Sequence, residues 1–391
     1  MISKTKKGST IKVSSIIIFM YSISVLIQSF TAEYESSGFI SQLKYVVFLL
    51  TCGICLLYMN KTRKVKVFRD ELKSILWIIA SFAIISIIRS ILSRHFTTRT
   101  IQELIFLLIP ILFAYCILNT LDKNKIDKCM MFTLIIFIVG YFIEIDMGLN
   151  EFIKALSSMS FSNSYSMLES STFAGVSIAI AMYFLYFRSN KFGFILSIIF
   201  VILTFKRLAL VFMVFLIILP KIFNYNRKVN YKLVNYIKIG TLVLTIFYFT
   251  IMIPENVEKI NNMFNIDLYK LTMSRTYRFK LIYNNSNFIN TGLGSTYSYM
   301  MRLYEVSLEM DMIKLLIEVT PVGIFIFINN MFNIVKKNWY CMILMLFQFF
   351  NLITSHSLAS VFSWIIFYIT LGCILYNNDV NYVRKKKKII Y

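Results

Sequence analysis

The sequence predicts an all-α fold: a polytopic integral membrane helical bundle of about twelve transmembrane helices, forming a single membrane domain over residues 1–391. Two observations support this. Hydrophobic residues make up 58% of the chain and charged residues only 15%, so a single soluble core could not cover the apolar surface. In addition, apolar runs of about 15 to 20 residues, long enough to cross a bilayer as a helix, recur along the whole chain.

The expected spans follow one another with mostly short polar connections. The first six are 11–30, 43–59, 74–92, 100–119, 129–145 and 171–187, and the other six are 192–205, 208–223, 233–253, 312–328, 339–353 and 358–376. The first run resembles a secretory signal, but its length of about 20 residues and the absence of a small-residue cleavage site after it favour a retained span. The sequence contains no phosphate-binding glycine-rich loop, which disfavours a nucleotide-driven pump.

The positions of Lys and Arg predict the orientation, because short basic connections stay on the cytoplasmic side. With an even number of spans, the two termini and every second connection share one side, where they hold 27 of the 41 basic residues but 5 of the 19 acidic residues. We therefore expect a multi-pass protein of the cytoplasmic (inner) membrane with both termini in the cytoplasm. Topology and attraction to anionic membrane lipid account for the formal charge of +22, so no nucleic-acid partner is expected.

The six cysteines all fall inside expected spans or at their ends. Cys52 and Cys55 have the spacing of a metal or redox pair, but they lie in the middle of an expected helix without a second pair. Packing as small apolar residues explains them better. The sequence therefore predicts no disulfide framework, no metal and no cofactor.

The longest polar stretch covers residues 254–311, between two expected spans on the extracytoplasmic side, and carries six basic and six acidic residues. Its many aromatic residues distinguish it from a disordered segment, so we expect short helices lying over the bundle. Aromatic side chains there suit sugar rings and the membrane interface equally well. A second outer loop, rich in Ser and Asn, is expected over residues 146–170.

Charged residues near the hydrocarbon are costly and tend to mark a polar path. Arg89 lies one turn from the outer end of its expected helix, where lining a cavity and snorkelling to the interface are both open. Lys206 and Arg207 occupy a tight outer connection, where the positive-inside rule disfavours adjacent cations unless an anionic group binds there. Contact with lipid headgroups is the alternative for this pair.

A further set of charges begins the helix that follows the long loop. Asp311, Lys314 and Glu318 are spaced i, i+3 and i+7, which places them along one face. Glu318 would lie two turns deep, and a carboxylate there must be paired or protonated. We expect Lys314 or an Arg of the loop to be its partner, in a structural or a catalytic role.

The predicted outer face thus gathers cations beside a few carboxylates. Arginine suits bidentate phosphate recognition, and a lipid diphosphate in the outer leaflet is the natural anion at this depth. The candidate diphosphate-binding residues are Lys206, Arg207, Arg275, Arg278 and Arg302. Fixed Arg charges would stabilise a diphosphate leaving group without a metal, and Glu309 and Asp311 are candidate general bases for an acceptor hydroxyl.

Three stretches of the chain resemble the bacterial polysaccharide polymerase and O-antigen ligase superfamily, which includes the Wzy-type polymerases of O-antigen and capsule pathways. LTFKR at 203–207 is similar to a turn at the outer end of a central helix in that family. SRTYRFKLIYNNSNFINTGLGS at 274–295 is similar to its Ser-Arg segment followed by Gly-x-Gly. EMDMIKLLIEVTPVGIFIF at 309–327 matches a polar triplet, an apolar helix, a Glu and a Gly-bounded turn. The likeness covers the central and C-terminal halves.

The resemblance implies a GT-C-like bundle and a membrane glycosyltransferase of the cell envelope. This enzyme would polymerise oligosaccharide repeat units carried on polyprenyl (undecaprenyl) diphosphate into capsule, O-antigen or exopolysaccharide, with no nucleotide sugar and no metal. Its catalytic residues would be Arg207, Glu309 and Asp311. A flippase and a chain-length regulator of the same pathway are further expected partners.

One departure from the family pattern bears on the reaction. Ligases of the superfamily carry a His at the head of the third stretch, where this chain has Glu309. His356, in the last outer turn, could supply an imidazole from elsewhere, although a lone His there is more often polar lining. The candidate cavity-lining residues are Arg89, Lys314, Glu318 and His356. A glycan ligase using the same donor and a flippase of lipid-linked units remain the alternatives to a polymerase.

Overall fold

The computed structural model describes residues 13–30, 39–61, 66–146, 170–188, 190–222 and 228–377, with a few single positions between 148 and 157. This part of the chain consists of helices and their connections and contains no strand, which confirms the all-α prediction. The basic N-terminal residues, the C-terminal run of Lys and Arg, and most of the 146–170 loop lie outside the described residues.

The helices are α1 (Val13–Phe30), α2 (Phe39–Lys61), α3 (Arg69–Ser93), α4 (Arg99–Thr120), α5 (Lys123–Ile145), α7 (Ser171–Phe187), α8 (Lys191–Leu203), α9 (Arg207–Ile222), α10 (Tyr231–Met252), α11 (Pro254–Phe264), α12 (Leu268–Leu271), α13 (Arg275–Tyr283), α14 (Ser295–Tyr304), α15 (Asp311–Val335), α16 (Trp339–Thr354) and α17 (Val361–Leu375). Each expected span overlaps one of the longer helices, and the predicted short helices of the 254–311 stretch are present as α11 to α14.

The composition of the helices is that of a membrane protein. Within the described residues, six helices are long and apolar enough to cross a membrane, namely α1 to α5 and α10. Five shorter apolar helices accompany them, and α15 is long but carries three charged residues in its first half. Large apolar side chains such as Leu57, Trp77, Leu92 and Phe247 are exposed on the outer surface, where lipid would solvate them. Twelve spans and a GT-C-like arrangement remain predictions.

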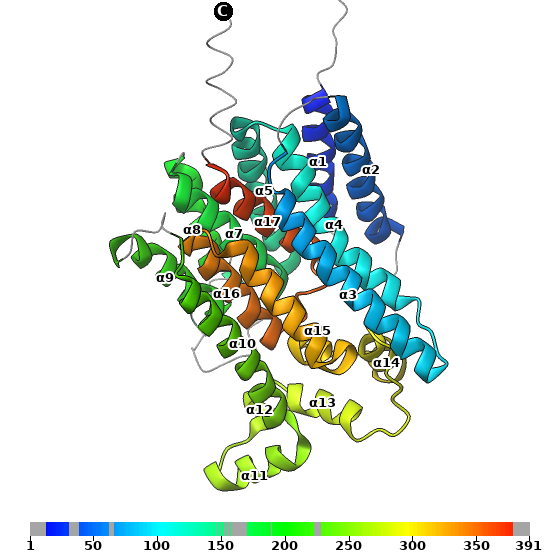
Figure 1. The fold of residues 1–391 in the computed structure, drawn as a ribbon. Helices are drawn as coiled ribbons and strands as arrows, with labels where there is room; N and C mark the ends of the chain where they lie inside the picture. The colour runs from blue at the N-terminus through cyan, green and yellow to red at the C-terminus, as the bar shows by residue number, and fades with distance from the viewer. Residues whose placement is uncertain are drawn as a thin grey trace, which may run out of the picture.

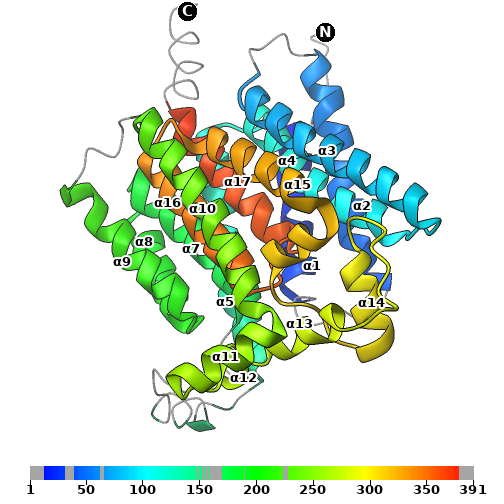
Figure 2. The same ribbon diagram turned by 60° about the horizontal axis from the view of Figure 1, so that its bottom comes forward.

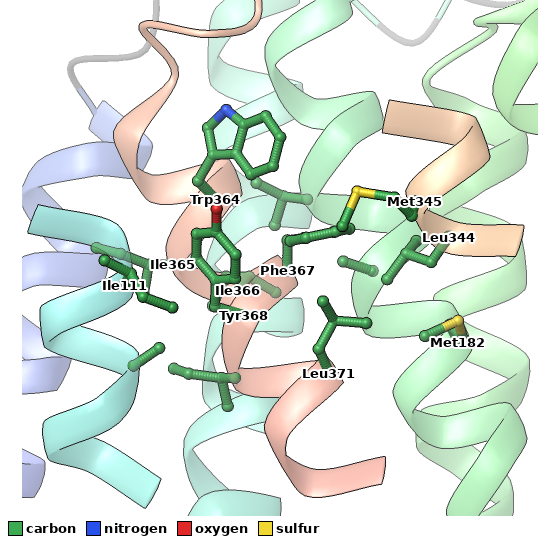
Figure 3. Packing of buried hydrophobic residues seen from close by; sticks show 14 of the residues in the cluster. Ile111, Met182, Leu344, Met345, Trp364, Ile365, Ile366, Phe367, Tyr368 and Leu371 are labelled. Carbon is green, nitrogen blue, oxygen red and sulfur yellow. The ribbon is translucent and has the colours of Figure 1, made fainter. Parts of the chain in front are cut away.

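The centre of the bundle is α17. Every residue from Val361 to Ile374 is buried, so this helix has no face toward the surroundings. It packs against α4 and α7, and its side chains interdigitate with those of α4, α7 and α16 (Figure 3). Gly372 lets Leu118 of α4 lie directly against the backbone of α17, because any larger residue there would collide with the leucine.

The short helices α11 to α14 gather at one end of the bundle (Figures 1 and 2). α10 leads directly into α11, whose first residue is Pro254, as suits a helix start. α14 contacts both α4 and α15 at this end. The C-terminal end of α3, the N-terminal ends of α4 and α15, and the connection between α16 and α17 are therefore brought together around the polar segment.

Candidate functional site

The turn before α14 is clamped between α3 and α4. The hydroxyl of Ser86 accepts a hydrogen bond from the Leu293 backbone N–H at 3.0 Å. Ser90 donates to the Thr291 carbonyl at 2.9 Å, and Thr100 donates to the Leu293 carbonyl at 2.7 Å. Three hydroxyl groups from two helices thus fix a loop that lies about 200 residues further along the chain.

This turn requires both of its glycines. Gly292 has φ 100°, and a Cβ there would lie 2.5 Å from the Cα of Ser86. Gly294 has φ 86°, and a Cβ there would lie 2.7 Å from Cγ of Arg99. Left-handed backbone and contact with a neighbouring helix both exclude side chains at these positions. The Gly-x-Gly of the sequence is therefore a packing feature of the loop against α3 and α4.

The helix α15 is broken near its middle. Thr320 has φ 66° and ψ 168°, and Pro321 follows it, so the N-terminal half of α15 ends at Val319. Pro321 has no N–H to donate to the Ile317 carbonyl four residues earlier. The side-chain amide of Asn290 donates to that carbonyl instead. The Oδ1 of Asn290 accepts from the Gly292 N–H, which ties the glycine turn to the break.

Glu318 lies at the end of the N-terminal half of α15 and is fully buried. Its carboxylate accepts from the backbone N–H of Gly294 at 2.8 Å, and from the N–H and hydroxyl of Thr296 at 2.9 and 2.6 Å. These groups form the start of α14, where the helix dipole also favours a negative charge. The prediction that Lys314 or an Arg would pair directly with Glu318 was therefore wrong, because two backbone N–H groups and the Thr296 hydroxyl donate to its carboxylate instead.

Lys314 joins a second buried group of charges. Its Nζ donates to Oε1 of Glu103 at 2.9 Å, and both side chains are almost completely buried. Arg99 donates from Nε to the same oxygen at 2.9 Å. The guanidinium of Arg99 also lies 3.7 Å from the ring centroid of Tyr297 on α14. One carboxylate therefore holds two cations at the N-terminal ends of α4 and α15.

Asp311 begins α15 and is completely buried. One carboxylate oxygen accepts the backbone N–H groups of Ser357 and Leu358, each at 2.6 Å, and the other lies 2.9 Å from Nδ1 of His356. Burial opposes a charge on the imidazole, but the carboxylate of Asp311 and its hydrogen bond outweigh this, so the pKa of His356 is raised above its ordinary value. The direct contact with an acceptor predicted for Asp311 does not fit this geometry, because its oxygens are enclosed.

Arg275 and Arg278 meet Glu309 at the surface of the polar segment. The Nη1 of Arg278 lies 2.7 Å from Oε1 of Glu309, and Nε of Arg275 lies 3.9 Å from Oε2. Arg278 also donates to the Ser307 carbonyl at 3.1 Å. The Nε of Arg275 is buried and has no hydrogen-bond acceptor among the described residues. Glu309 is 38% exposed, so ligands can reach this group.

The other predicted site residues lie apart from this group. Lys206 is buried in the connection before α9, and Arg207 begins that helix. α9 and α14 lie at opposite sides of the bundle in both views (Figures 1 and 2). Arg302 is exposed in the last turn of α14, and Arg89 is half-buried on α3 beside Ser90. The structure thus joins Arg275 and Arg278 to Glu309, without bringing all five predicted cations to one point.

Arg99, Glu103 and Tyr297 are members of the site that the sequence alone did not predict. Arg99 and Glu103 are four residues apart at the N-terminal start of an otherwise apolar helix, and this spacing is the signal that could have revealed them. Tyr297 carries no comparable signal, because its role depends on distant residues. In the described part of the chain, no group of three or more His, Cys, Asp or Glu side chains is arranged to hold a metal ion.

Comparison with known proteins leaves the family open. No model of a known protein family matches the chain, and no curated protein matches it. The likeness to polysaccharide polymerases therefore depends on the three stretches described above.

Proposed function

We propose that this chain is a membrane glycosyltransferase that polymerises oligosaccharide repeat units carried on polyprenyl diphosphate at the outer face of the cytoplasmic membrane. The donor would bind through its diphosphate, and the sugar of a second unit would displace that diphosphate. The reaction needs an anion-binding group at the membrane surface, an acceptor site beside it and a base.

The pair formed by Arg275 and Arg278 is the observation that carries the proposal. The two residues are one turn apart on α13, so their guanidinium groups lie on the same side of the helix and converge on one carboxylate. The buried Nε of Arg275 still lacks an acceptor among the described residues. A diphosphate presents several oxygens that match such a pair of guanidinium groups, and its larger negative charge would compete with Glu309.

The position of α13 suits a lipid-linked donor. The segment that carries it begins where the apolar helix α10 ends, so the Arg pair would lie near the level of lipid headgroups. Tyr277 and Tyr283 on the same helix are exposed and offer ring faces to sugars. In this assignment the Arg pair stabilises charge on the leaving diphosphate, while Lys206, Arg207 and Arg302 attract the donor to the outer surface.

Reconstitution tests the proposal. The purified chain in lipid vesicles should convert polyprenyl-diphosphate-linked repeat units into a ladder of longer glycans. The double variant R275A/R278A should lose activity by about 100-fold or more, because two donors to the leaving group are removed. K259A changes an exposed cation on α11 and serves as the control. Full activity in the double variant, or no polymer from the wild-type chain with the matching donor, would contradict the proposal.

A deletion strain separates the related functions. Loss of a polymerase should leave single repeat units on the carrier, accessible from outside. Loss of a ligase should leave long polymer on the carrier, and loss of a flippase should trap single units at the inner leaflet. Either of the last two results would move the assignment to that function.

A further inference from the structure

His356 lies in the connection between α16 and α17 with its orientation fixed on two sides. Its Nδ1 is hydrogen-bonded to Asp311 at 2.9 Å. Its ring stacks on Tyr297 with centroids 5.9 Å apart and planes 18° apart, and Arg99 lies over the same tyrosine. No described residue hydrogen-bonds to Nε2, and the side chain is 11% exposed. The Nε2 of His356 is therefore available to contact a ligand.

The partner of His356 is itself held in place by hydrogen bonds. Asp311 accepts two backbone N–H groups in addition to its contact with the imidazole, which fixes the position of its side chain. The connection that supplies them is itself anchored, because Trp364 donates from its indole to the Ser357 carbonyl at 3.0 Å. With Asp311 as acceptor, the proton of a neutral imidazole is placed on Nδ1, and Nε2 carries the lone pair.

The short segment 309–311 links the imidazole to the Arg pair. Glu309, which binds Arg275 and Arg278, is two residues from Asp311, so their Cα atoms are at most about 7 Å apart. A donor diphosphate on the Arg pair and an acceptor hydroxyl at His356 would thus be held beside the same short segment. The reaction requires this proximity, because the acceptor oxygen must reach the carbon that carries the diphosphate.

We propose that His356 is the general base of the reaction and that Asp311 is its positioning residue. This inference depends on the proposed function. The Nε2 lone pair takes the proton of the acceptor hydroxyl as its oxygen bonds to the anomeric carbon of the donor. The bond from that carbon to the diphosphate breaks, and its electron pair leaves with the diphosphate. The imidazolium then returns its proton to solvent.

The charges around His356 set the expected pH dependence. Asp311 and Glu103 are the carboxylates that act on the ring, Lys314 is the nearby cation, and Arg99 faces it through Tyr297. Because only the neutral imidazole can act as a base, activity should rise with pH through a pKa above the ordinary value of about 6.5. The contribution of the charged imidazole and Asp311 to the free energy of unfolding follows the opposite trend. It is complete at low pH and is lost as pH rises through that pKa.

The test compares H356N with D311N and H95N in the reconstituted reaction. H356N retains a side-chain donor for Asp311 but has no base, so the polymerisation rate should fall by about 100-fold or more and lose its rise with pH. D311N should lower the rate, because the amide no longer fixes the proton of the imidazole on Nδ1. It should also shift the dependence of the rate on pH. His95 is the other histidine of the chain and is exposed, so H95N should match the wild type. Binding of the lipid-diphosphate donor should persist in H356N.

Added imidazole provides a second measurement that a purely structural role would not change. The smaller variant H356A leaves room at the ring position, and imidazole in the buffer should restore part of its activity. An active H356N with the pH profile of the wild type would overturn the inference and leave the polymerase assignment intact. Absence of polymer in the wild-type reaction would instead contradict the assignment itself.

Discussion

At the scale of single residues, the site depends on groups that would be costly elsewhere in a membrane bundle. A buried carboxylate at Glu318 is tolerated because three donors surround it, and Asp311 is tolerated for the same reason. The glycine turn that supplies the donors to Glu318 is possible only because positions 292 and 294 lack a side chain. The burial of each carboxylate is therefore explained by the backbone geometry of the segment that donates hydrogen bonds to it.

The substitution G292A should destabilise the chain by about 1–3 kcal/mol or more, because it combines a left-handed backbone with a collision against the backbone of Ser86. Thermal unfolding in detergent measures the effect. At Gly240 on α10, a Cβ would have no other atom within 4 Å, so G240A should change stability by less than about 1 kcal/mol. Equal behaviour of the two variants would contradict the packing role of the turn.

The substitution E309Q tests whether Glu309 competes with a bound anion for Arg275 and Arg278. Removing the charge that occupies Arg275 and Arg278 should tighten binding of inorganic pyrophosphate by about 2- to 5-fold, a modest gain because Glu309 is partly exposed. Calorimetry at low ionic strength measures this. E258Q alters an exposed carboxylate on α11 and should have no effect. Weaker binding to E309Q would show that Glu309 helps to hold the anion.

At the scale of the elements, the break in α15 organises the site. The N-terminal half carries Asp311, Lys314 and Glu318, and each finds a different partner from another part of the chain. The break leaves the Ile317 carbonyl without a helical donor, and Asn290 donates to it and thereby fixes the glycine turn. A proline in an apolar helix thus creates the attachment point for the polar segment.

A double-mutant cycle tests this attachment. N290A should lower stability by about 1–3 kcal/mol, because the buried carbonyl of Ile317 and the turn both lose a partner. P321A supplies a backbone N–H at position 321, so N290A should cost less in that background. A coupling of at least about 0.5 kcal/mol between the two changes is expected from unfolding in detergent. Strictly additive losses would contradict the link between the break and the turn.

The sequence predicts the elements better than the site. Apolar runs located the long helices, because length and hydropathy are local properties. The shared face of Asp311, Lys314 and Glu318 was also evident from spacing. Their partners were not evident from the sequence. Glu103 is 211 residues from Lys314, and Gly294 contacts Glu318 only because of the tertiary structure. Contacts of this kind arise from tertiary packing, which a single sequence does not record.

At the scale of the whole molecule, two polar groups mark opposite ends of the bundle. The site groups lie at the N-terminal ends of α4 and α15. Near the other end of the bundle, Lys337 on the connection after α15 pairs with Glu71 at the start of α3, and Tyr376 donates to the same carboxylate. The positive-inside rule predicts that this second end faces the cytoplasm.

Cysteine labelling tests the orientation. All six native cysteines are buried, so the background from a membrane-impermeant maleimide should be low. K259C on α11 should react in intact cells, whereas K232C at the start of α10 should react only after the membrane is opened. The reverse pattern would place Arg275 and Arg278 in the cytoplasm and exclude an outer-face reaction.

The complete enclosure of α17 has a consequence for biogenesis. This helix is the last of the described chain to leave the ribosome, yet its neighbours α4 and α7 are made long before it. Those helices must wait in the bilayer with their inner faces covered only by lipid or by insertion factors. A chain that stops before Val361 would retain a hollow centre, and quality-control proteases should remove it even though every residue before that point has been synthesised.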